Sequence, residues 1–426
     1  MILDFNIVYS LLSKFERAGQ EETPSTPIRL VREMLDKLPP EIWSDPSKTF
    51  LDPACSTGTF LLEIVRKLNI GLASQMPDQT ERLKHILTKQ VWGLEKSLVP
   101  LLTTKAAFKK LFINTTGIVG KVNIYHANTL DGAEEIKDMK FDVVVGNPPY
   151  QAPAKSDKGH KSPLNGNTLW DKFVSLAVKE LTKADGIVAF VHPAGWRKPQ
   201  SERSRYKGML ELMAHDNHMA YLSIHDSKDG MKTFNAGTRY DWYVIRKGTA
   251  GTTIVSDENG NESTLDCREW KWIPNHSYDD VRGLLGTGEV IYSTSAYEPR
   301  KAHVVSAEDK GGPFVYPVIH SITKKGVRYV YSSRNDRGHF GVPKAIISSA
   351  AGINDVVVDP DGVYGMTDMT LAIPILSEED GALLRKYLLS DHARNILNAC
   401  LFANYRLDWR IFNDFKQGFW RNQDGQ

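Results

Sequence analysis

Through its first 247 residues the chain alternates between short apolar segments and longer amphipathic ones. The short apolar segments predict strands at 49–51, 91–94, 122–125, 141–145, 186–191 and 242–245. The spacing of apolar residues between them predicts helices at 27–38, 57–68, 97–113 and 168–182. For the first helix we expect Thr26 as the N-cap and Pro27 as the first helical residue. Such an alternation is typical of a mainly parallel α/β sheet.

The character of the sequence changes near residue 248. Segments 248–252 and 259–261 are rich in turn-forming residues, and an Asn-Gly hairpin is predicted between Ile254 and Leu265. After this point the sequence is irregular and rich in glycine until two helices, which are predicted near 378–390 and 392–400. A chain of 426 residues suits two domains. We expect them to span residues 1–248 and 249–426.

Composition excludes several classes of protein. Hydrophobic residues make up 41% and charged residues 24% of the chain, as in folded soluble proteins. We find no apolar run long enough to span a membrane and no signal peptide at the N-terminus. Cys55, Cys267 and Cys400 are too widely spaced for a disulfide framework or a zinc cluster. We therefore expect a cytoplasmic protein without a metal site.

Basic residues are concentrated in two parts of the chain. Residues 151–250 hold 16 Lys and Arg against 10 Asp and Glu, and residues 300–344 hold nine against three. Local positive patches of this kind favour phosphate binding, although a solvated surface would also explain either one.

A turn of small residues follows the strand predicted at 49–51. Asp52 stands at the strand end, and the turn and helix start contain Pro53, Ala54, Ser56, Thr57, Gly58 and Phe60. In open α/β sheets ligands bind beyond the carboxyl ends of the strands, and small side chains let a ligand approach the backbone amides. Glu95 after the next strand could accept both hydroxyls of a ribose, and Asn128 after the third could bond an adenine ring. Taken singly, a tight turn and two surface residues would explain the same positions.

The segment Asn147-Pro148-Pro149-Tyr150 is the sharpest motif in the sequence. A buried strand delivers Asn147 to the sheet edge, and the two prolines fix the backbone after it. The Asn147 side-chain oxygen and the Pro148 carbonyl could accept the two N–H bonds of an adenine amino group and favour its attack on a methyl sulfonium. Tyr150 would stack on the target ring, which must leave the duplex to reach such a pocket. A proline-rich turn that only caps a strand would explain the same segment without a catalytic role.

With these motifs in this order, the chain resembles the gamma-class, TaqI-like N6-adenine DNA methyltransferases. The resemblance implies a Rossmann-like class I sheet that binds S-adenosylmethionine, followed by a C-terminal α+β target-recognition domain. It implies cofactor contacts from Thr26, Pro27, Asn147 and the turn residues already named, together with Glu95 and Asn128. Ser56 stands where the family usually has glycine, and Asn128 where many relatives have aspartate.

The same resemblance implies the substrate contacts. Phe234 resembles an aromatic that packs on the flipped base, although a core phenylalanine would fit the same pattern. We expect DNA contacts from the two basic segments, through Arg197, Lys198, Arg203, Arg205, Arg334 and Arg337. Double-stranded DNA is the expected partner, with a cognate restriction endonuclease as a second candidate.

Three other functions stay open on the sequence alone. The tetrapeptide also serves transferases that methylate protein glutamine, and adenine in RNA offers the same amino group. A DNA-binding module with a decayed cofactor site is the non-enzymatic alternative, but intact Asp52, Glu95, Asn147 and Tyr150 oppose it.

Overall fold

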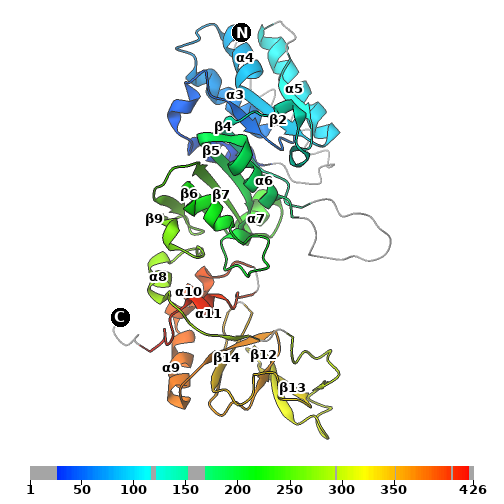
Figure 1. Ribbon diagram of the computed structural model, residues 1–426, viewed down its shortest axis with the longest axis vertical. Helices are drawn as coiled ribbons and strands as arrows, with labels where there is room; N and C mark the ends of the chain where they lie inside the picture. Colours follow the sequence, from blue (N-terminus) through cyan, green and yellow to red (C-terminus); the bar gives the residue numbers. More distant parts are fainter. Residues whose placement is uncertain are drawn as a thin grey trace. The chain divides into compact units, whose positions relative to one another are not determined.

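The computed structural model describes residues 26–116, 121–151, 168–292, 295–350, 352–403 and 406–421. The chain forms two compact units (Figure 1). Unit 1 comprises Met1–Trp196 and Glu202–Lys271, and unit 2 comprises Arg197–Ser201 and Trp272–Gln426.

Unit 1 is built on one large sheet. Within the described residues its nine strands run in the order β3-β2-β1-β4-β5-β7-β6-β8-β9. Their bounds are β1 Phe50–Asp52, β2 Val91–Glu95, β3 Asn123–His126, β4 Phe141–Gly146, β5 Thr182–Pro193, β6 His218–His225, β7 Tyr240–Arg246, β8 Thr253–Ser256 and β9 Glu262–Leu265. Strands β1 to β5 are parallel, whereas β7 is inserted antiparallel between β5 and β6. The expected mixed α/β architecture is confirmed, with a mainly parallel sheet in its first five strands.

The four helices predicted in unit 1 lie close to their expected positions, and the structure adds two that were not predicted, α4 and α7. The helices are α2 Ile28–Asp36, α3 Thr59–Gly71, α4 Gln79–His85, α5 Leu98–Thr116, α6 Trp170–Leu176 and α7 Ser227–Phe234. Helix α2 buries Leu30, Val31, Met34 and Leu35 in one core with α3 and the strands, because these residues share one face of the helix. Helix α6 continues into the π-helical turn Ala177–Leu181, which packs on β4 and β5.

The start of α2 corrects one expectation. Pro27 rather than Thr26 occupies the N-cap position, and no side chain caps the helix there. The Thr26 hydroxyl is turned instead toward the carboxyl edge of the sheet, where it contacts Asn147.

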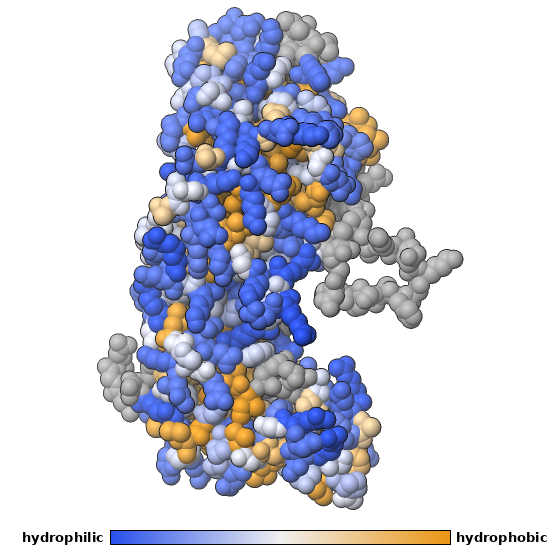
Figure 2. All heavy atoms as spheres, viewed as in Figure 1, coloured by the Kyte–Doolittle hydropathy of each residue, from blue (hydrophilic) through white to orange (hydrophobic). Residues whose placement is uncertain are grey.

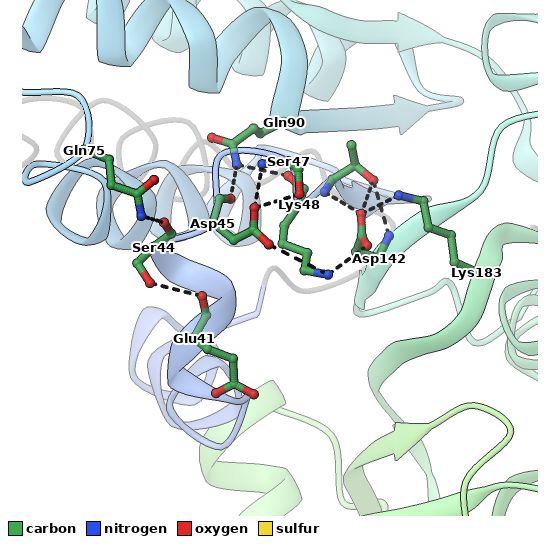
Figure 3. A network of polar contacts seen from close by, with 10 residues as sticks. Glu41, Ser44, Asp45, Ser47, Lys48, Gln75, Gln90, Asp142 and Lys183 are labelled. Atoms are coloured by element: carbon green, nitrogen blue, oxygen red, sulfur yellow. Dashed lines mark hydrogen bonds and ion pairs between the residues drawn. The ribbon is translucent and has the colours of Figure 1, made fainter.

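The opposite, amino edge of the sheet is held by a polar network (Figure 3). Asp142 at the start of β4 accepts hydrogen bonds from Lys183 Nζ at 2.7 Å and from the backbone N–H and hydroxyl of Thr49, both at 2.9 Å. Burial opposes ionisation, but these bonds hold the pKa of Asp142 below its usual value. The network joins the chain before β1 to β4 and β5, at the edge opposite the small-residue turn after β1 and the Asn147–Tyr150 segment after β4.

The hairpin predicted between Ile254 and Leu265 is confirmed, but its position changes the expected division of the chain. Strand β8 pairs with β9 and also lies parallel to β6, so the hairpin extends the large sheet. The first compact unit therefore continues to Lys271, past the predicted boundary at residue 248.

Unit 2 contains two four-stranded sheets within its described residues, in the orders β10-β17-β14-β15 and β11-β13-β12-β16. The strands are β10 Ile291–Tyr292, β11 Val304–Ser306, β12 Tyr316–Thr323, β13 Gly326–Ser332, β14 Lys344–Ser348, β15 Val356–Asp359, β16 Gly365–Met366 and β17 Thr370–Pro374. The helices are α8 Tyr278–Leu284, α9 Glu378–Leu388, α10 Asp391–Ala399 and α11 Ile411–Asp414. The predicted helices near 378–390 and 392–400 are confirmed as α9 and α10.

The surface drawn in Figure 2 is mostly hydrophilic, with hydrophobic residues in small groups. In the parts of the chain that the structure describes, no helix combines the length and apolar composition that crossing a bilayer requires.

Candidate active site

A large cleft opens at the carboxyl edge of the unit 1 sheet. Strands β1, β2 and β4 are neighbours in parallel register, with Asp52 opposite Gly93, so their ends meet at the same edge. The cleft has a volume of about 1910 Å³, and both the small-residue turn and the Asn147–Tyr150 segment line it. Two motifs about 95 residues apart in the sequence are thus brought to one site.

The small-residue turn has a backbone that most side chains resist. Ser56 adopts φ +44° and Gly58 adopts φ +86°, both in the left-handed region. A Cβ atom at Gly58 would stand 2.6 Å from Thr104 Cγ2, and the Thr104 hydroxyl donates to Ser56 O at 2.7 Å. Positive φ at Ser56 explains why glycine is usual there in the family that the sequence resembles.

Glu95 at the end of β2 holds this turn in place. Its carboxylate accepts hydrogen bonds from Ser56 N at 2.9 Å and from Ser97 N at 2.5 Å. The residue is buried but borders the cleft, so its carboxylate is oriented by the backbone before any ligand binds. The sequence predicted a ribose-binding acid at this position, and this geometry is compatible with that role.

Asp52 is almost completely buried at the base of the cleft. Its Oδ1 atom accepts from Ala54 N at 3.0 Å, and a Cβ at Gly146 would approach Oδ1 to 2.7 Å. Burial, with the nearby charge of Glu95, raises the pKa of Asp52 to about 8 against an ordinary value of 3.8. A positively charged ligand group beside Asp52 would lower its pKa again and favour the ionised carboxylate.

The Asn147–Tyr150 segment presents an unsatisfied acceptor to the cleft. Asn147 Nδ2 donates to Thr26 Oγ1 at 3.0 Å, which leaves the amide oxygen on the other side. That oxygen is buried, and among the described residues it has no hydrogen-bond partner. A buried acceptor without a partner is costly, so a donor from a bound molecule would complete the site.

Two aromatic residues, Tyr150 and Phe234, line the cleft together with Asn147. Tyr150 is half-buried, burial of its hydroxyl raises the pKa of that group, and Leu169 N donates to Tyr150 O at 3.0 Å. Phe234, the last residue of α7, also lines the cleft and is only 6% exposed. The structure thus brings together Asn147, Pro148, Pro149, Tyr150 and Phe234.

Most of the expected cofactor residues also line the cleft. The residues that line it are Thr26, Asp52, Pro53, Ala54, Ser56, Thr57, Phe60, Glu95 and Asn128, whereas Pro27 and Gly58 do not. Gly58 instead shapes the turn, as its positive φ requires. Asn128 is partly occupied within its own loop, since Oδ1 accepts from Leu130 N and Nδ2 donates to Asp131 Oδ2.

Sequence reasoning missed several residues of this wall. Leu98, Val99 and Pro100 at the start of α5 border the cleft, and Leu98 and Val99 are 55% and 62% exposed. Asp131 lines it beside Asn128. The available signal was position, because these residues follow the carboxyl ends of β2 and β3, but their types are not distinctive.

The basic residues expected to bind DNA differ in availability. Arg197 is fully buried in unit 2, where it donates to Ile273 O at 2.9 Å and to Asn275 Oδ1 at 3.1 Å. Its expected phosphate contact is therefore wrong for this structure, because its guanidinium has no access to solvent. Lys198 lies 3.8 Å from Asp408, and Arg203 is exposed.

The remaining cations are paired but accessible. Arg205 lines the cleft and binds both oxygens of Asp171 through Nε and Nη2. Arg334 and Arg337 are exposed on unit 2, and each lies beside Asp336. A phosphate would have to compete with these carboxylates.

Comparisons with known proteins agree with this geometry. Residues 64–229 match the family of the Eco57I restriction-modification methylase. An uncharacterized adenine-specific methylase of Mycoplasma pneumoniae is 28% identical over 325 residues, which cover 60% of this chain and 75% of the relative. The methylase subunit of the type I restriction enzyme EcoEI of Escherichia coli is 26% identical over 209 residues, 48% of this chain and 39% of that subunit.

Solved structures show the likeness in fold. The DrdV–DNA complex superposes on 98% of this chain with a TM-score of 0.57 and 13% identity, and MmeI bound to DNA on 97% with a TM-score of 0.51 and 13% identity. This chain spans 59% and 66% of the length of those two chains.

Proposed function

We propose that this chain is an adenine-specific DNA methyltransferase of the restriction-modification type, which transfers the methyl group of S-adenosylmethionine to N6 of a flipped-out adenine. The similarity to the Eco57I family, to an adenine-specific methylase and to a restriction-enzyme methylase subunit supports this. The substrate base would lie between Tyr150 and Phe234, and the cofactor beside Asp52 and Glu95. A cytoplasmic location follows from such an activity.

One observation carries the proposal. The Asn147 side-chain oxygen is buried at the cleft wall and has no partner among the described residues, while Thr26 holds the other end of the amide. An exocyclic amino group is a donor of the right size and valence for that oxygen. Proline at positions 148 and 149 keeps the acceptor where it is, so little reorganisation is needed when the base arrives.

The residues around the turn fit S-adenosylmethionine. Thr57 Oγ1 is buried without a partner among the described residues, and the Glu95 and Asp52 carboxylates border the same space. The exposed apolar side chains of Leu98 and Val99 offer a surface for an adenine ring. When bound, S-adenosylmethionine would supply a methyl group on a positively charged sulfur.

The protein's own groups would then act by orientation. Asn147 Oδ1 and the Pro148 carbonyl would accept the two N–H bonds of the amine and draw its lone pair out of conjugation with the ring. Tyr150 and Phe234 would hold the ring by stacking, which replaces the contacts that the base loses on leaving the duplex. No strong general base is needed, because the amine proton becomes acidic once the nitrogen is alkylated.

We further propose that unit 2 recognises the DNA sequence. Exposed Arg334 and Arg337 support this role, as does the fold likeness to DNA-bound DrdV and MmeI over nearly the whole chain. Double-stranded DNA is the proposed substrate, and a restriction endonuclease of matching specificity remains a proposed partner.

The test compares variants of the full chain with tritiated S-adenosylmethionine and three acceptors, namely unmethylated genomic DNA, total RNA and ribosomal protein. Wild type should label DNA at adenine N6. Asn147→Ala should label DNA at least about 100-fold more slowly, because it removes an acceptor used in the transition state. Its affinity for the cofactor should change little.

Asn69→Ala is the matched control, since Asn69 lies on α3 and its amide oxygen accepts from Arg82 rather than facing the cleft. It should label DNA at the wild-type rate. Label on RNA or on protein glutamine in place of DNA, or unchanged turnover in Asn147→Ala, would defeat the proposal.

A further inference from the structure

A compact polar cluster on α7, β6 and β7 contacts Phe234, which lines the cleft. Asp229 on α7 is its centre. Asp229 Oδ2 accepts from the Tyr240 hydroxyl at 2.5 Å and lies 2.9 Å from His225 Nδ1 and 3.4 Å from Thr233 Oγ1. One carboxylate oxygen thus joins the helix to both strands beneath it.

The cluster is tied to Phe234 by direct contact. The Phe234 ring meets the Tyr240 ring edge-to-face, with centroids 5.0 Å apart and planes at 84°. The Tyr240 ring is in turn stacked on His225 at 4.3 Å with an interplanar angle of 4°. Phe234 therefore packs against the Tyr240 ring, whose hydroxyl is held by Asp229 and whose face is held by His225.

The backbone of α7 reinforces this arrangement. The Asp226 side chain caps the helix by accepting from Asp229 N at 2.8 Å. Asn235 ends it with φ +53°, and a Cβ at Gly230 would stand 2.1 Å from Thr238 O. The helix can therefore neither extend nor shift against the 236–238 turn, which fixes the place of its last residue.

A hydrolytic role for the cluster is excluded by burial. Ser223 Oγ lies 3.0 Å from His225 Nε2, so Ser223, His225 and Asp229 have the connectivity of a nucleophile triad. Ser223 is only 3% exposed on β6, however, and no acyl group could reach its hydroxyl. The contacts of Asp229 and Tyr240 lead to Phe234 and not to an accessible nucleophile.

The electrostatics of the cluster favour a fixed geometry. Burial opposes ionisation of Asp229, but the hydrogen bond from Tyr240 and the nearby His225 hold the pKa of Asp229 below its usual value. Hydrogen bonds to an ionised acceptor are shorter and stronger than neutral ones.

We propose that Asp229, Tyr240 and His225 are positioning residues for the target adenine, which act by holding Phe234 at the stacking distance from the flipped base. This inference rests on the proposed function and adds to it a set of residues that touch neither base nor cofactor. Removal of the Tyr240 hydroxyl would leave the Phe234 ring in place on average but less restrained.

The experiment first locates the recognition site by sequencing methylated adenines in DNA from cells that express the full chain. A duplex with that site then serves for kinetics, and a second duplex with 2-aminopurine at the target position reports base extrusion by fluorescence. Tyr240→Phe and Asp229→Asn should lower kcat roughly fivefold, the equivalent of one ordinary hydrogen bond, with cofactor affinity unchanged. Their 2-aminopurine emission should fall between wild type and Phe234→Ala.

A double-mutant cycle separates positioning from general stability. In a Phe234→Ala background, Tyr240→Phe should have no further effect on kcat, because the ring through which it acts is gone. Tyr221→Phe is the control, since Tyr221 stacks on Trp242 and lies outside the cleft lining. It should match wild type in rate and emission.

The outcomes are distinct. A wild-type protein that methylates no adenine overturns the proposed function and this inference together. An active wild type with additive effects of Tyr240→Phe and Phe234→Ala, or with unchanged emission in Tyr240→Phe and Asp229→Asn, overturns the inference alone.

Discussion

At the scale of single residues, the small-residue turn holds two residues in the left-handed region, Ser56 and Gly58. Gly58 suits that conformation, but Ser56 carries a side chain into it. The left-handed conformation costs a residue with a Cβ about 1–2 kcal/mol. The turn is kept because Glu95 and Thr104 bind the Ser56 backbone from both sides.

Substitutions at the two positions should therefore have opposite effects. Gly58→Ala should lower the free energy of unfolding by about 1–3 kcal/mol, because its Cβ adds a clash with Thr104 to the strain. Ser56→Gly should leave it unchanged or raise it by up to about 1 kcal/mol, since relief of strain is offset by a more flexible unfolded chain. Urea unfolding of both variants measures this, and a destabilised Ser56→Gly would contradict the strain argument.

Asp52 should make stability depend on pH in an unusual direction. Its pKa is about 8 in the folded state and 3.8 ordinarily, so between these values the folded state alone holds the proton. Stability from this residue is complete below pH 3.8 and is lost as pH rises toward 8, by up to about 1.4 kcal/mol per pH unit. Asp52→Asn should lack this fall when unfolding is followed from pH 6 to 8.5.

Asp45→Asn is the control for that series. Its carboxyl bonds Ser47 at the other edge of the sheet, and these bonds hold the pKa of Asp45 below 3.8, so the residue stays ionised throughout. An equal pH dependence in wild type and Asp52→Asn would contradict the assigned cause.

Single residues also show where sequence reasoning succeeds. Asn147, Tyr150, Asp52 and Glu95 were found because strand ends and prolines place their side chains without long-range information. Arg197 was misjudged because a run of basic residues says nothing of burial, and its partners Ile273 and Asn275 lie more than 75 positions away.

At the scale of elements, the amino edge of the sheet is fastened where β1, β4 and β5 begin. Asp142 collects its hydrogen bonds there from Lys183 and Thr49 (Figure 3). The carboxyl ends of β1 and β4 lead into the small-residue turn and the Asn147–Tyr150 segment, so the hydrogen bonds of Asp142 hold these two strands in register at their amino ends.

Asp142→Asn should cost about 1–3 kcal/mol of stability at pH 7, since an amide cannot accept all of these bonds. The pKa of Asp142 is lowered in the folded state, so its contribution is complete above pH 3.8 and is lost as pH falls through the folded value. The difference between wild type and variant should shrink below pH 4. Denaturation of both proteins at pH 7 and pH 3.5 measures the two differences in stability. Equal differences at the two pH values would show that the loss comes from packing and not from the charge of Asp142.

Most elements of unit 1 were predicted within a few residues, because their apolar spacing is strongly periodic. Strand β6 was not predicted, since His218–His225 mixes polar and apolar residues and is recognised only by its pairing with β7 and β8. The pairing of β6 with β8 could not be predicted from the sequence either. For this reason the turn-rich segment near residue 248 was interpreted as a domain boundary.

At the scale of the whole molecule, the two units are not consecutive pieces of chain. Residues Arg197–Ser201 belong to unit 2 although unit 1 both precedes and follows them. Arg197 anchors this segment through bonds to Ile273 and Asn275.

Arg197 and Arg203 should therefore separate stability from DNA binding. Arg197→Met should lower stability by about 3–5 kcal/mol, because it leaves a buried carbonyl and a buried amide oxygen without their donor. Arg203→Ala should leave stability unchanged and reduce the salt dependence of DNA binding by a slope of about one. Thermal unfolding measures the effect on stability, and salt titrations of DNA affinity measure the effect on binding. A stable Arg197→Met variant with a reduced salt slope, or an Arg203→Ala variant that is destabilised, would contradict this assignment.

The excursion of Arg197–Ser201 also bears on how unit 2 could be exchanged between related chains. A recombination event with one junction at residue 271 would join a foreign unit 2 to a segment that still carries the old Arg197. The incoming unit would then meet an arginine selected for a different set of carbonyl partners. Exchange that keeps the buried bonds matched requires at least three crossovers, one on each side of Arg197–Ser201 and one after Lys271.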